Sequence, residues 1–161
     1  PADGSNPTDS NSMLPQTPHK KLIVKSAQGV VTVSTASTTT YTVTVGSKSG
    51  GGNAFYIDGV ERPSITINEG SSAIFNLSDN TVDSHPFYLS TTSDGSHGGG
   101  SVYTTGVTFK INGSSVSQSA YASGYSSATT RALEITVASS APTLYYYCSS
   151  HSGMGNSIST P

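Results

Sequence analysis

The chain has almost no sulfur and little charge. Of its 161 residues one is cysteine and two are methionine, and tryptophan is absent. A single cysteine cannot form a disulfide within the chain, so the cysteine content does not indicate in which cellular compartment the protein lies. Charged residues make up 10% of the chain, and its seven Lys and Arg leave a net charge of -2. Since the only basic cluster is "HKK" at 19–21, we expect no nucleic acid as a main partner.

Long apolar runs are also missing. No stretch approaches the roughly 18 consecutive apolar residues of a membrane span, so we expect none. No signal peptide is recognisable and the first residue is Pro1, so we expect a processed product or a fragment. The low charge and the abundance of Ser, Thr and Gly are typical of a secreted or particle-surface protein.

The first 40 residues differ from the rest of the chain. Residues 1–20 contain four prolines and few apolar side chains, which predicts an extended arm. Short apolar runs at 22–25 and 29–33 predict strands, and 34–40 is interpreted as a linker or an edge segment. We therefore assign 1–40 to an extended N-terminal arm with short strands and 41–161 to one domain.

The domain shows the alternation of apolar and polar residues that is typical of half-buried strands. Turn signals recur about every 8 to 12 residues and no long helical pattern is present, which predicts an all-β, Greek-key β-sandwich of about seven to nine strands. Residues 112–130 are small and polar apart from two tyrosines, which predicts a long surface loop or an irregular edge strand. The predicted strands are 41–45, 54–59, 64–68, 73–77, 85–90, 106–111, 131–137 and 143–148.

The scarce residues gather in one place, "YYYCSSHSGMG" at 145–155. Cys148 ends a predicted strand, and His151 and Met154 follow in a short loop of serines and glycines. A fourth ligand would come from elsewhere, and His85, at the start of "HPFYLS", is the best candidate. Two histidines and one cysteine with a weak axial methionine form the donor set of a blue-copper site. The pattern therefore predicts a metal site, with copper as the expected ion.

These motifs resemble the cupredoxins, the family of plastocyanin, amicyanin and pseudoazurin. The resemblance covers residues 41–161 and lies in "YYYCSSHSGMG", which is similar to the copper loop in order and spacing, and in "HPF" at 85–87. The two residues between His151 and Met154 make the loop as short as in amicyanin. By position, the resemblance implies His85, Cys148, His151 and Met154 as ligands of one type 1 copper.

The chain also departs from related families. Multicopper oxidases have histidines for a trinuclear cluster where this chain has Tyr88 and Ser90, and they flank the cysteine with histidines where it has Tyr147 and Ser149. We therefore do not expect an enzyme. Plastocyanin-like carriers usually place an Asn after the upstream histidine to tie the ligand loops together, and here that residue is Pro86.

A narrower resemblance concerns the biological setting. "HPFYLSTTSDGSHGGGSVYTTGV" and "APTLYYYCSSHSGMG" look like cupredoxin-type modules in structural proteins of marine bacteriophages, especially those of cyanobacteria. This implies a virion or surface decoration module that contacts neighbouring subunits through its N-terminal arm. One alternative is a soluble blue-copper electron-transfer protein with a redox partner, periplasmic or secreted. A second is a metal-free structural fold.

Each residue of the motif also has a simpler interpretation. Cys148 could be a small buried hydrophobe, Met154 could fill the core, and His151 could be an ordinary loop residue. His97, in the glycine-rich loop 93–101, is interpreted as a loop histidine, with a ligand or electron-entry role as the alternative. Strand alternation predicts Tyr146 and Cys148 on one face, and Tyr145 and Tyr147 on the other, with one of the two faces buried.

Overall fold

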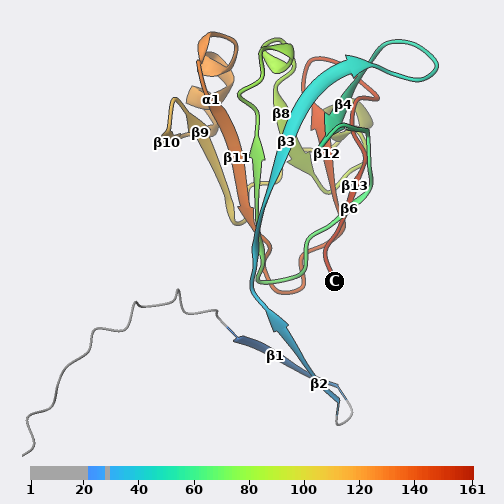
Figure 1. Cartoon of the computed structure of the whole chain (residues 1–161), viewed down its shortest axis with the longest axis vertical. Helices are drawn as coiled ribbons and strands as arrows, with labels where there is room; N and C mark the ends of the chain where they lie inside the picture. The colour runs from blue at the N-terminus through green and yellow to red at the C-terminus, as the bar shows by residue number, and fades with distance from the viewer. Residues whose placement is uncertain (1–21, 28–29) are drawn as a thin grey trace, which may run out of the picture.

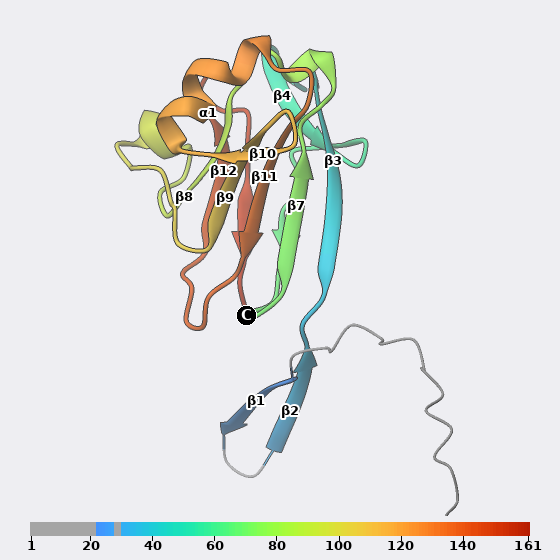
Figure 2. The same cartoon turned by 90° about the vertical axis from the view of Figure 1, so that its left-hand side faces the viewer.

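The structure is a computed structural model that describes residues 22–27 and 30–161, with side chains from residue 36 onward. The predicted extended arm, residues 1–20, lies outside the described residues. Strands β1 (Leu22–Ala27) and β2 (Val30–Thr35) pair only with each other, as an antiparallel two-stranded sheet. They confirm the short strands expected there. Figures 1 and 2 show this hairpin beyond one end of the remaining fold.

Two sheets form the rest of the described chain and confirm the predicted sandwich. The larger sheet has seven strands in the order β10-β9-β11-β7-β3-β4-β5, and the smaller has four in the order β6-β13-β12-β8. Both sheets are mixed, because β3 runs parallel to β7 and β13 runs parallel to β6. Strands that are neighbours in space are often distant in sequence, as in a Greek key. The larger sheet contains β3 (Thr38–Ser47), β4 (Asn53–Ile57), β5 (Val60–Glu61), β7 (Ser72–Asn76), β9 (Val107–Ile111), β10 (Ser114–Val116) and β11 (Arg131–Thr136).

The smaller sheet carries the motif-bearing segments. It contains β6 (Ile65–Thr66), β8 (Phe87–Ser90), β12 (Leu144–Cys148) and β13 (Ser157–Ser159). In the antiparallel pair of β8 and β12, Cys148 lies opposite Phe87. Strand β8 is shorter than the predicted strand 85–90, so His85 lies just before it. The eleven strands of the two sheets outnumber the seven to nine expected, because pieces as short as β5 and β6 leave little alternation to recognise.

Aromatic side chains fill the space between the sheets. Phe87 packs against Phe75, with ring centroids 5.0 Å apart, and stacks on Tyr146 at 5.7 Å. The buried core brings together side chains from both sheets, which gives each sheet one apolar face. Its largest fully buried members are Tyr121, Tyr125, Tyr146, Tyr147, Phe55, Phe75, Phe87, Leu77, Leu89, Leu133, Ile135 and Leu144.

Residues 112–130 are not one long surface loop: their first part forms an edge strand, which was the alternative interpretation, and the rest is helical. Asn112 and Gly113, both at positive φ, turn β9 into the short edge strand β10. Helix α1 (Gln118–Gly124) and the 3-10 turn η3 (Tyr125–Ser127) follow. Tyr121 and Tyr125 are fully buried, so the segment covers part of the core. It lies at the end of the sandwich away from the β1–β2 hairpin (Figures 1 and 2).

Two smaller differences concern strand ends and alternation. Strand β3 begins at Thr38, inside the segment interpreted as a linker or edge, and pairs there with Ser72 of β7. Tyr146, Tyr147 and Cys148 are all buried, whereas alternation predicted that only one of the two faces of this strand would be buried. The cause is that loop residues also cover the outer side of β12, where the backbone of Gly95 packs against the Tyr147 ring. No helix in the described ranges is long and apolar enough to cross a bilayer.

Candidate metal centre

Cys148 is placed by strand β12 and by the turn that follows it. Its side chain is fully buried at the end of the strand, and the Ser149 amide donates to the Pro86 carbonyl at 3.0 Å. That bond ties the start of the cysteine loop to the residue after His85. Burial raises the pKa of the Cys148 thiol, although hydrogen bonds from the Ser150 and His151 amides lower it in part.

His85 is placed by a capped turn just before β8. Asp79 caps the 3-10 turn η1 (Asn80–Val82) by accepting the Thr81 amide at 2.9 Å. The His85 amide then donates to the Val82 carbonyl at 2.8 Å. Asp83, which follows Val82, forms an ion pair with the buried Arg131 of β11, with 2.6 Å between the carboxylate oxygen and the guanidinium nitrogen. This ion pair fastens the turn to the larger sheet. His85 is therefore held by the backbone on both sides, with its side chain only 6% exposed.

The two histidines and the cysteine converge on one point. The Cys148 Sγ lies 3.9 Å from the His85 Nδ1 and 3.7 Å from the His151 Nδ1. The two imidazole centroids are 4.6 Å apart, and the three possible ligand atoms all lie within 4.8 Å of one another. His85 and Cys148 are buried, whereas His151 is exposed. The structure thus brings together three residues that are up to 66 positions apart in the sequence.

These spacings fit a shared metal ion. Metal–imidazole and metal–thiolate bonds of roughly 2.0 and 2.3 Å, meeting at about 120°, would separate nitrogen from sulfur by about 3.7 Å. Without a metal, the same atoms make ordinary contacts between a thiol and ring nitrogens. Burial first, and then the charge of His151, lower the pKa of His85, which favours the neutral imidazole that a metal requires.

Met154 lies beside this group. Its side chain is fully buried, and its carbonyl accepts the Phe55 amide of β4 at 2.9 Å, which ties the end of the loop to the larger sheet. Gly155 follows so close to the Tyr146 carbonyl that a Cβ at that position would collide with it. The thioether is a soft donor, which suits copper more than the hard cations that oxygen ligands select. The four residues resemble a type 1 copper site.

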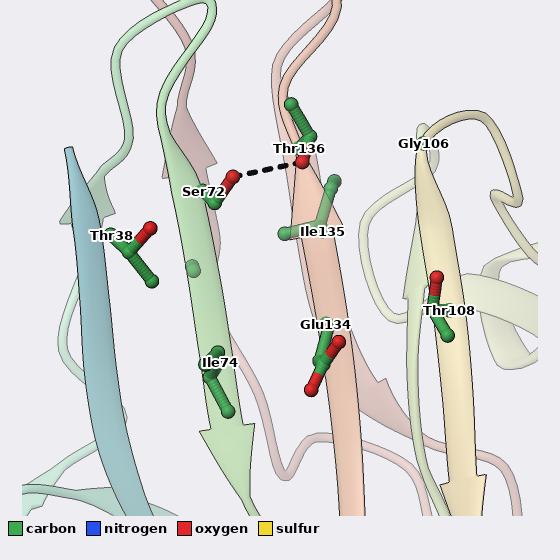
Figure 3. Close-up of a pocket in the computed structure, with 9 residues that line it drawn as sticks. Thr38, Ser72, Ile74, Gly106, Thr108, Glu134, Ile135 and Thr136 are labelled. Carbon is green, nitrogen blue, oxygen red and sulfur yellow. Dashed lines mark hydrogen bonds between the residues drawn. The ribbon is translucent and has the colours of Figure 1, made fainter. Parts of the chain in front are cut away.

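A pocket opens next to the cluster. It encloses about 500 Å³ and is lined by His97, His151 and Met154 together with Lys48, Gly52, Asn53, Ser150 and Ser152. A second pocket of about 270 Å³ lies on the outer face of the larger sheet (Figure 3). There Ser72 and Thr136 share a hydrogen bond of 2.8 Å, and the residues lining it include no histidine or cysteine. Of these two pockets, the first is the one lined by candidate ligands, His151 and Met154.

Two residues near the cluster were not predicted to contact it. The Nε2 of His97 lies 3.0 Å from the Cys148 carbonyl oxygen, so this loop histidine is hydrogen-bonded to the backbone of the cysteine. The Asp94 carboxylate accepts the Gly153 amide at 2.9 Å. Both contacts join positions more than 50 residues apart, and neither has a signal in the local sequence.

Comparison with known proteins does not supply a function. No family model matches the chain, and no curated protein matches it either. The functional inference therefore rests on the chemistry and geometry of the His85, Cys148, His151 and Met154 cluster.

Proposed function

We propose that the chain is a cupredoxin-type module that binds one copper ion in a type 1 site. His85, Cys148 and His151 would hold the ion, and Met154 would be the weak axial donor. The observation that carries the proposal is the placement of Cys148 Sγ within 4 Å of two imidazole Nδ1 atoms at the end of a buried strand. Thiolate and imidazole together suit both Cu(I) and Cu(II).

The proposed activity is one-electron transfer. A bound copper ion would supply the redox couple, and the protein would supply a rigid set of donors. Cys148 ends β12, His85 follows a capped turn, and Met154 is tied to β4, so all three are fixed by backbone contacts outside the loop. His151 is exposed and lines the pocket. We therefore expect electrons to pass between the copper and a redox partner through the imidazole of His151.

We further propose a carrier or structural role in place of catalysis. The positions where multicopper oxidases have further histidines hold Tyr88, Ser90, Tyr147 and Ser149. In the larger setting, the module would belong to a virion or particle-surface protein and contact other subunits through its N-terminal segment. This part is supported by the resemblance to phage structural modules and by the β1–β2 sheet, which pairs with neither sheet of the sandwich.

A copper titration tests the proposal. Metal-free protein is titrated with Cu(II) and followed optically, beside Cys148→Ser and the control Ser150→Ala, which alters an exposed serine of the same loop. We expect an intense blue thiolate-to-copper band that saturates at one copper per chain in the wild type and in the control, and no such band in Cys148→Ser.

Two results would contradict the proposal. Absence of the band in the wild type would favour a metal-free structural fold. An unchanged Cu(II) spectrum in Cys148→Ser would mean that the ligand set is wrong.

A further inference from the structure

The segment from Cys148 to Met154 (the ligand loop) needs support from outside, because its middle is exposed. Ser149, Ser150, His151 and Ser152 are all exposed, and Gly153 has a φ of 70°. Two of the three proposed strong ligands, Cys148 and His151, belong to this segment. Its conformation therefore decides how the cysteine and the exposed histidine face each other.

A single turn from another part of the chain contacts both ends of the ligand loop. The turn comprises Asp94 and the 3-10 residues Gly95–Gly98 (η2). At one end the Asp94 carboxylate accepts the Gly153 amide at 2.9 Å. At the other end the His97 Nε2 lies 3.0 Å from the Cys148 carbonyl, and since a carbonyl only accepts, Nε2 carries the proton and donates.

The turn itself is seated firmly on β12. The backbone of Gly95 packs so closely on the Tyr147 ring that a Cβ would collide with it. Asp94 has a φ of 59°, a left-handed conformation that a non-glycine residue adopts at some cost. The His97 amide donates to the Asp94 carbonyl at 3.1 Å, which links the two contacting residues.

The residue after His85 is a proline, whose side chain cannot form a hydrogen bond to the ligand loop. Pro86 offers only its carbonyl, which accepts the Ser149 amide. The Gly153 end of the loop has other contacts too: Arg62 and Lys48 lie 3.2 Å and 3.5 Å from the Gly153 carbonyl, and the Met154 carbonyl accepts the Phe55 amide. The Gly153 amide itself is held by Asp94.

We propose that the turn Asp94–Gly98 is the brace of the ligand loop, in which Asp94 fixes Gly153 and His97 fixes Cys148, so that both act as positioning residues for the metal site. The inference rests on the proposed copper function. It also assigns an electrostatic effect to Asp94, because a carboxylate beside the site stabilises the more positive oxidation state of the metal.

Matched variants separate the hydrogen bond from the charge. Asp94→Asn keeps an acceptor oxygen and tolerates the positive φ but loses the charge, whereas Asp94→Gly tolerates the φ and loses both. Asp58→Gly is the control, because Asp58 also has a positive φ (50°) and also accepts a backbone amide, that of Thr42 at 2.8 Å, in the β4–β5 turn. His97→Gln keeps a nitrogen donor at a similar reach, and His97→Ala does not.

The first readout needs no metal. Hydrogen exchange of the Gly153 amide in the metal-free protein should be faster in Asp94→Gly and close to wild type in Asp94→Asn and Asp58→Gly. The second readout is copper affinity by competition with a chelator, where Asp94→Gly and His97→Ala should each weaken binding by about tenfold. The third is the reduction potential, which should rise in Asp94→Asn.

The outcomes distinguish the two proposals. Unchanged Gly153 exchange in Asp94→Gly, or an equal loss of copper affinity in Asp58→Gly, would overturn the brace. If the wild type bound no copper, the proposed function would fail, and the exchange result would still decide whether the turn holds the loop.

Discussion

At the scale of single residues, Met154 differs from the other three candidate ligands in the bond it can offer. Thiolate and imidazole bind copper strongly, whereas an axial thioether is a long, weak ligand that tunes the site. Because Met154 is fully buried and its carbonyl is bonded to Phe55, the side chain stays in place whether or not it binds the metal.

Replacement of Met154 should therefore alter the properties of the copper without releasing it. We expect Met154→Gln to keep one copper per chain and to change the optical spectrum and the reduction potential. Met154→Leu, which keeps the volume and removes the donor, is the matched variant. Absorption spectroscopy and voltammetry check this, and loss of copper from both variants would show that Met154 holds the metal as strongly as Cys148.

His85 links the site to the stability of the metal-free protein. Burial, and then the charge of His151, lower its pKa below the ordinary value of 6.5. The folded state therefore takes up this proton less readily than the unfolded chain. The stabilisation from neutral His85 is fully present above the unfolded pKa and is lost as pH falls through the lowered folded pKa.

A pH series tests this linkage. The free energy of unfolding of the metal-free wild type should fall between about pH 7 and pH 5, and it should fall less in His85→Gln, which has no titrating side chain there. Urea unfolding across this range measures both slopes. Equal slopes in the two proteins would contradict the assignment of the effect to His85.

At the scale of elements, the sequence predicts best where alternation is long and regular. Residues 41–45 alternate clearly and form part of β3, and the mostly apolar run at 73–77 forms most of β7. The spacing of Cys148, His151 and Met154 is local, so the sequence shows it directly. His97 and Asp94 contact the ligand loop across more than 50 positions, and such a contact depends on sheet packing that no local pattern records.

The error at residues 112–130 has an identifiable cause. Helix α1 is short and made mostly of small polar residues, so no long apolar stripe marks it. Two signals were nevertheless present. Ser117 caps the helix by accepting the Ala120 amide at 3.2 Å, and Tyr121 and Tyr125 are four residues apart, the spacing that places side chains on one helical face.

Tyr121 connects this helix to the start of β8. Its buried hydroxyl donates to the Phe87 carbonyl at 3.1 Å, two residues after His85. We expect Tyr121→Phe to cost about 1 kcal/mol of unfolding free energy through the lost hydrogen bond. Tyr121→Ala should cost about 3 to 5 kcal/mol, because it also leaves a cavity among aromatic rings. Denaturant unfolding checks both values, and equal losses would mean that the hydrogen bond, and not the packing, carries the contribution of Tyr121.

At the scale of the whole molecule, the hairpin and the candidate metal centre lie at opposite ends. Helix α1 contacts Phe87, which pairs with Cys148, and α1 is at the end away from the β1–β2 hairpin (Figures 1 and 2). A neighbouring subunit bound at the hairpin would therefore leave the candidate copper centre open to a redox partner.

The sandwich should fold without the preceding segment. Among the described residues, strands β1 and β2 pair with each other and with no other strand, and the Ser37 carbonyl already accepts the Ser72 amide at 2.7 Å. We expect a chain that begins at residue 36 to keep the thermal midpoint and the copper stoichiometry of the full chain, and to lose any self-association that the full chain shows. Calorimetry and sedimentation measure these properties. A large drop in the midpoint would show that the N-terminal residues belong to the folded unit.

The central claim is that one ion is shared by His85, Cys148 and His151. X-ray absorption at the copper edge of the fully loaded protein tests it most directly, because it identifies the atoms bound to the metal. We predict one short sulfur ligand and two nitrogen ligands, with little change on reduction, since the donors are held by β12 and by the turn before β8. A shell of nitrogen and oxygen alone, without the sulfur, would contradict the account.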